Sequence, residues 1–126
     1  MPNVLLFVSS EATEQVKTLI PELGKVLREA TANVLGDIQP HHVAVMAFPF
    51  FTGDNATAMQ IFCVASTSPA REPKLKDWAI ALSEAWHKFA EEHHITWGND
   101  VDVWLTMPKG QWMMATEEGI TRAKAP

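Results

Sequence analysis

The stretch MPNVLLFV, residues 1–8, opens the chain with a proline that leads into a run of apolar residues. We expect a β-strand over residues 3–8, apolar on both faces and therefore part of a sheet that is covered on both sides. Proline tolerates the first position of a strand, so Pro2 can simply mark where the strand begins. If Met1 is removed after synthesis, Pro2 instead becomes an amino terminus with a secondary amine, a base that no internal proline offers.

A helical pattern follows this strand. From about residue 13 to residue 35, apolar residues recur at every third or fourth position, which is the spacing of one helical face. Pro21 lies inside the pattern, where it either kinks the helix or occupies the first turn of a helix that is capped near Thr18. A turn at Gly36 ends the helix, and HVAVMAFPF, residues 42–50, predicts a second strand.

The same order of elements appears a second time. AMQIFCVAS, residues 58–66, predicts a strand, residues 73–93 a helix, and VDVWLTM, residues 101–107, a further strand. The strands of the two halves overlie one another at offsets of 57 and 58 residues, although few residues are identical. The chain therefore contains two β-α-β units, about 2–51 and 57–107, followed by a hairpin or tail over 108–126.

These units predict the architecture. Each should pair its two strands in parallel through a right-handed crossover. Related by a pseudo-twofold axis, the units give an α/β (α+β) fold in which a four-stranded mixed sheet carries both helices on one face, and we expect one domain over residues 1–126. The other face of the sheet is left bare although its strands are apolar. A bare apolar face usually marks a subunit interface, so we expect an oligomer.

Composition narrows the class of protein. A chain of 126 residues, 47% apolar and 20% charged, fits one globular domain with a core of its own. No apolar run approaches the length of a membrane span, and a net charge of −5 without a basic stripe argues against nucleic acid as a partner. The lone Cys63 cannot form an internal disulfide and no secretory signal precedes the first strand, so we expect a cytoplasmic location.

The Met-Pro start before a strand, the two β-α-β units and the implied oligomer together resemble the tautomerase superfamily. The layout is similar to that of members with both units in one chain: macrophage migration inhibitory factor, 5-carboxymethyl-2-hydroxymuconate isomerase and malonate semialdehyde decarboxylase. EATANVLGDIQPHHVAVM, residues 29–46, is similar to the end of their first helix, turn and second strand, and MPKGQW, residues 107–112, to the segment after their last strand. The resemblance implies a homotrimer that needs no cofactor.

The resemblance also implies which residues carry the chemistry. The amino-terminal proline, here Pro2, would be the general base in keto-enol tautomerisation of a small 2-oxo or enol acid. A free α-amino group has a reference pKa of about 7.7 to 8.0, and an apolar pocket with a neighbouring cation lowers the pKa of an amine. Members of the family use arginines after the third strand to hold a carboxylate, which points to Arg71, with Ser66 beside it. For Arg71, helix capping and pairing at the surface is the alternative.

The chain also departs from the family. Cytokine-like members carry a lysine where this sequence has Asp37, and the sequence has no tyrosine to serve as their aromatic pocket acid. We expect Trp112, with Phe48, to line the pocket in its place. His41 is a further candidate for contact with substrate, against the simpler interpretation of a solvated imidazole.

Other functions and sites remain open at this stage. The same site could act as a decarboxylase, or as a hydratase or dehalogenase, and a trimeric binding protein could keep the fold without the chemistry. We expect no metal site, because the adjacent histidines at 41–42 and at 93–94 point apart. Cys63, Trp78 and Trp86 are expected in the core, whereas the sequence leaves Trp97 and Trp104 undecided.

Overall fold

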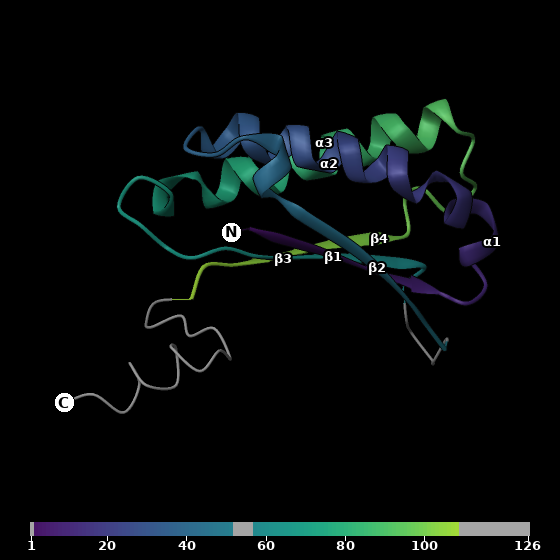
Figure 1. The fold of residues 1–126 in the computed structure, drawn as a ribbon. Coiled ribbons are helices and arrows are strands. Elements are labelled where there is room, and N and C mark those ends of the chain that lie inside the picture. Colours follow the sequence, from purple (N-terminus) through teal and green to yellow (C-terminus); the bar gives the residue numbers. More distant parts are fainter. Residues whose placement is uncertain (1, 52–56, 109–126) are drawn as a thin grey trace.

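The computed structural model describes residues 2–51 and 57–108, which form one sheet beneath a layer of helices (Figure 1). The elements, in chain order, are β1 (Asn3–Ser9), α1 (Thr13–Val16), η1 (Lys17–Leu19), α2 (Ile20–Leu35), η2 (Pro40–His42), β2 (Ala44–Phe50), β3 (Met59–Val64), η3 (Glu72–Lys74), α3 (Leu75–Glu92) and β4 (Val101–Thr106), where η marks a short 3-10 helix. Both long helices, α2 and α3, lie on the same face of the sheet, as predicted.

The four strands of the described sheet follow the order β2-β1-β3-β4. Each outer strand is parallel to its neighbour within the same β-α-β unit, so β1 pairs with β2 and β3 with β4. The two units meet where β1 and β3 pair antiparallel, with Asn3 opposite Val64 and Val8 opposite Met59. This mixed sheet confirms the two-unit architecture and the pseudo-twofold relation that the sequence predicts.

Alternate residues of the central strands build the core. On β1, Val4, Leu6 and Val8 are buried beneath the helices. Trp78 and Trp86 of α3 are fully buried as predicted, and the indole Nε1 of Trp78 donates a hydrogen bond to Thr31 Oγ1 of α2 at 3.0 Å. This bond ties the two helices together inside the core, where an indole N–H left without an acceptor would be costly.

The first helical segment is broken ahead of Pro21, which agrees with the second of the two alternatives, a proline in the first turn of a helix. After the short α1 and η1, α2 begins at Ile20, with Pro21 in its first turn. The amides of a first helical turn have no partner within the helix, so proline is tolerated there although it would disrupt a helix interior. The second strand also begins later than predicted, at Ala44, because Pro40–His42 forms a 3-10 turn ahead of it.

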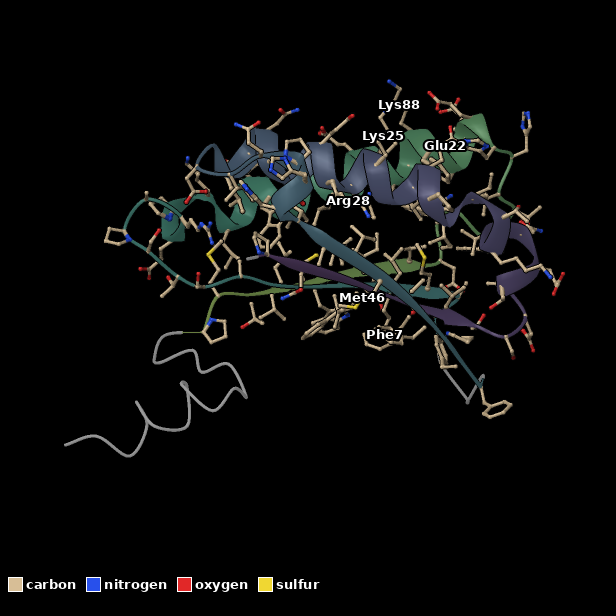
Figure 2. The ribbon with its side chains drawn as sticks, in the orientation of Figure 1. Phe7, Glu22, Lys25, Arg28, Met46 and Lys88 are labelled. Carbon is tan, nitrogen blue, oxygen red and sulfur yellow. The ribbon has the colours of Figure 1, made fainter. Side chains whose placement is uncertain are left out.

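The opposite face of the sheet, which we call the bare face, carries no helix in the described part of the chain and is apolar at its middle. One row across it consists of Met46, Leu5, Phe62 and Trp104, which the strand registers bring side by side. Trp104 is 56% exposed, which settles its place outside the core, and Figure 2 shows Phe7 and Met46 on this side, away from the helices. None of the helices in the described ranges is both long and apolar enough to span a membrane.

Cys63 lies on the helix-facing side of β3 and is fully buried, as predicted. Burial raises the pKa of its thiol from the usual value of 9.0 to about 12, because the thiolate would lose its hydration. A thiol that stays protonated in the folded protein is neither a nucleophile nor a metal ligand at neutral pH.

We therefore expect Cys63 of the folded protein to resist an aromatic disulfide reagent at pH 8 and to react once the chain is unfolded in urea. The thiol of the unfolded chain ionises above pH 9.0, whereas the thiol of the folded protein keeps its proton until about pH 12. The stability due to this burial is therefore complete below pH 9.0 and is lost as the pH rises towards 12. Between pH 8 and pH 10 the wild type should lose about 1.4 kcal/mol more unfolding free energy than Cys63→Ala. Rapid labelling of the native protein, or equal losses for the two proteins, would contradict this account.

Candidate active site

The beginning of β1 lies between the beginning of β2 and the end of β3. The carbonyl of Pro2 accepts a hydrogen bond from the amide of Ala44 at 3.0 Å, and Pro2 is buried. Extending the antiparallel register of β1 and β3 by one residue places Pro2 opposite Ala65, directly before Ser66. The predicted base and the predicted substrate-binding loop therefore meet at one end of the sheet, which is visible in Figure 1 where β1 begins.

Ser66 and Arg71, both predicted as site residues, are in contact. The guanidinium Nη1 of Arg71 donates to the carbonyl and to the hydroxyl oxygen of Ser66, each at 3.4 Å. The loop between them closes on Ser68, whose carbonyl and hydroxyl oxygens each accept a hydrogen bond from the amide of Arg71 at 3.1 Å. Arg71 is only 8% exposed, so its interpretation as a surface arginine is wrong.

The strongest contact of Arg71 is with a residue that the sequence did not single out as its partner. Its Nε donates to Oδ2 of Asp37 at 2.8 Å, across 34 positions of sequence. Asp37 follows Gly36, which ends α2 in the left-handed conformation at φ 75°, where glycine is favoured because it has no Cβ. The arginine thereby links the loop before α3 to the end of α2.

A second cation supports this junction. The ammonium of Lys74 donates to the carbonyl of Leu35 at 2.8 Å, which is one of the last carbonyls of α2. The carboxyl end of a helix carries partial negative charge, so a cation held there is stabilising. We call the contacts of Arg71 with Asp37 and Ser66, together with that of Lys74 with Leu35, the clasp.

His41 lies on the other side of Pro2, beside the beginning of β2. It is exposed, its ring centroid is 4.1 Å from that of His42, and it lines an open cavity of about 500 Å³ together with Lys25, Arg28 and Glu29. Arg28 extends from α2 towards the sheet (Figure 2), and its Nε donates to the carbonyl of Val43, the residue before β2, at 3.2 Å. The two flanks of Pro2 therefore differ: one carries Arg71 and Ser66, and the other this cavity.

Two further expectations concern the wall of the pocket. Trp112 lies outside the described residues. Phe48 pairs in register with Phe7 and stacks on its ring at 5.7 Å, five residues along the strands from Pro2 and on the bare face. At about 3.3 Å per residue it lies roughly 16 Å along the strands from Pro2 of its own chain, and its place in a pocket stays a prediction.

One polar atom near Ser66 has no partner within residues 2–51 and 57–108. The hydroxyl of Thr67 is buried there without a hydrogen bond. Buried polar atoms are usually satisfied by protein, water or ligand, so this hydroxyl marks a place for a polar group. Among the same residues, no group of three or more His, Cys, Asp and Glu side chains is placed to hold a metal ion.

Comparison with known proteins gives similarity of structure only. No family model matches the sequence, and no curated protein matches it. Among solved structures, a macrophage migration inhibitory factor-like protein from Entamoeba histolytica is 20% identical and aligns over 91% of this chain and 95% of its own, with a TM-score of 0.61. A fused 4-OT described as an asymmetric trimer is 13% identical over 97% and 99%, with a TM-score of 0.60. Pt0534, solved after inactivation by 2-oxo-3-pentynoate, is 21% identical over 90% and 91%, with a TM-score of 0.54.

These structures are members of the tautomerase superfamily, and each aligns with nearly the whole of this chain. At such low identities the likeness concerns the path of the backbone and carries no residue roles. It agrees with the sheet order and the one-sided helices described above. The chain therefore has the fold of the tautomerase superfamily, the family that its sequence resembles.

Proposed function

We propose that this protein is a cofactor-free keto-enol tautomerase of small 2-oxo or enol acids, with Pro2 as its general base after removal of Met1. The observation that carries the proposal is the register of the central strands. It puts the beginning of β1 next to Ser66, which is bonded to the buried Arg71. A secondary amine, a fixed guanidinium and a hydroxyl group then lie at one end of one sheet.

The chemistry needs only proton transfer. The neutral amine of Pro2 takes the hydroxyl proton of the enol, and the ammonium so formed delivers a proton to the adjacent carbon, which leaves the ketone and regenerates the base. Burial and a nearby cation both favour the neutral amine over the ammonium. A base of this kind works near neutral pH without a metal or an organic cofactor.

Arg71 is proposed to hold the carboxylate of the substrate, because a guanidinium matches the two oxygens of a carboxylate. Ser66 fixes the guanidinium through its carbonyl and hydroxyl oxygens, and the buried hydroxyl of Thr67 offers a further hydrogen bond nearby. His41 is proposed to contact substrate from the β2 side. The proposal also retains Trp112 as a wall of the pocket.

A second candidate function is a binding protein that has kept the fold without the chemistry. One observation favours it: Asp37 already neutralises Arg71 at 2.8 Å, which reduces the positive charge available to a substrate. Decarboxylation, hydration or dehalogenation by the same residues are neighbouring alternatives, in which a protonated Pro2 would act as a general acid.

We also propose that the chain folds as one domain over residues 1–126 and assembles as a homotrimer through its bare face. The fused 4-OT structure, which shares the fold, is a trimer. The row of Met46, Leu5, Phe62 and Trp104 supplies the apolar surface that such an assembly buries. A cytoplasmic location belongs to the same proposal, since the chain has a single cysteine and it is a buried free thiol.

The role of Pro2 is tested with two proteins that differ only at the amino terminus. In one, methionine aminopeptidase removes Met1 to leave Pro2 as the first residue, and the other carries one glycine between Met1 and Pro2. Ketonisation of phenylenolpyruvate should be at least about 100-fold slower in the second protein, because its proline nitrogen is an amide. In the first, kcat/KM should rise with pH as the amine loses its proton. Equal rates would show that Pro2 only marks the start of the strand.

The same pair of proteins can be treated with 2-oxo-3-pentynoate, the compound that inactivates Pt0534. Its alkyne is conjugated to a ketone and accepts an amine nucleophile. Mass spectrometry should find one adduct per chain on the peptide that begins with Pro2, and none on that peptide in the glycine-extended protein. An adduct found elsewhere in both proteins would contradict the assignment of the base.

The trimer is tested by light scattering, in which the native protein should have about three times its chain mass of 14.0 kDa. Trp104→Glu places a charge in the apolar row of the bare face and should shift the protein towards the monomer. Ile80→Glu is the matched control, because Ile80 is 45% exposed but lies on α3 rather than on the bare face, and this variant should remain a trimer. A native protein that is monomeric at micromolar concentration would contradict the proposed trimer and its interface at the bare face.

A further inference from the structure

The carboxylate of Asp37 is the ion-pair partner of the guanidinium that is proposed to bind substrate, and it is the more exposed of the two side chains. The side chain of Arg71 is 10% exposed and that of Asp37 43%, and the two are joined at 2.8 Å. A ligand that approaches Arg71 therefore meets the carboxylate as well.

Asp37 is also held in place. Gly36, the residue before Asp37, directs the chain out of α2 in a conformation that favours glycine. On the other side of Gly36, the carbonyl of Leu35 accepts a hydrogen bond from Lys74. The ammonium of Lys74 lies 3.4 Å from the position that a Cβ on Gly36 would occupy, so this turn is closely packed. The negative charge is thus a fixed feature of the clasp and not that of a loose surface side chain.

We propose that Asp37 is a specificity-determining residue: it orients Arg71 through Nε and makes the site accept monocarboxylate 2-oxo acids in preference to dicarboxylates. The single carboxylate of a monoacid gains the guanidinium contact, which offsets its repulsion by Asp37. Within the clasp a second carboxylate finds no second guanidinium, and the other cation there, the ammonium of Lys74, is bonded to the carbonyl of Leu35. In a five-carbon acid, the two carboxylates lie within about one Debye length of each other, which is roughly 8 Å at physiological ionic strength, so Asp37 repels both.

This inference rests on the proposed function, because it takes Arg71 as the group that binds a carboxylate. It is tested by calorimetric titration of the glycine-free protein with 2-oxopentanoate and with 2-oxopentanedioate, which differ only in the terminal carboxylate. Asp37→Asn keeps an oxygen that can accept from Arg71 Nε and removes the charge. Glu14→Gln removes the same charge from α1, which follows the opposite end of β1.

The native protein should bind the monoacid more tightly than the diacid. Asp37→Asn should raise the affinity for the diacid relative to the monoacid by about two- to threefold, the effect of one charge at roughly 8 Å in water. Glu14→Gln should leave this ratio unchanged, and Asp37→Glu should keep the native preference. If the clasp served stability alone, Asp37→Asn would lower the free energy of unfolding and leave the ratio of the two affinities unchanged.

An unchanged ratio in Asp37→Asn would overturn the inference, as would a native protein that prefers the diacid. These outcomes are separate from failure of the proposed function, because calorimetry does not require turnover. A protein that discriminates between the two acids but works equally well with a blocked Pro2 would retain the selectivity of Asp37 and lose the proposed base.

Discussion

The antiparallel pairing of β1 with β3 is the constraint on which the rest of the structure depends. It joins the two β-α-β units at the centre of the sheet and, with a right-handed crossover in each unit, puts α2 and α3 on the same face. Because side chains alternate along a strand, a slip of one residue would exchange the buried side chains of β1, such as Leu6, with those of the bare face. The same pairing brings the beginning of β1 to the end of β3, so both the core and the candidate site depend on the register of these two strands.

The clasp is the second level of organisation, and it joins the end of the first unit's helix to the entrance of the second unit's helix. Arg71 contacts Asp37 at one end of this junction and Ser66 at the other, so the loop after β3 cannot move independently of α2. An arginine that is 8% exposed must have its charge compensated, and Asp37 provides this. In the proposed function, the same guanidinium that joins the two helices would also bind the substrate.

Much of the fold could be predicted because the spacing of apolar residues within each segment indicates whether it forms a strand or a helix. The apolar runs of the strands, the helical spacing and the repeat at a fixed offset predicted the four-stranded mixed sheet and both helices on one of its faces. What local patterns cannot show is a single turn such as Pro40–His42, which is too short to have a period, or a pairing such as Arg71 with Asp37 across 34 positions. That Ser66, to which Arg71 is bonded, follows the end of β3 beside the beginning of β1 was predictable from the strand pairing. The distance of Phe48 from Pro2 was not predicted, because it depends on the register of β2 against β1.

The central claim is that the secondary amine of Pro2 exists in the working protein. It is tested most directly by the intact mass of the protein purified from its own source, followed by sequencing of its amino-terminal peptide. The account predicts a mass lower than that of the full sequence by one methionine residue, with Pro2 as the first residue of the peptide. A protein that retains Met1 would have an amide at this position and could not use Pro2 as a base, which would contradict the mechanism while leaving the fold intact.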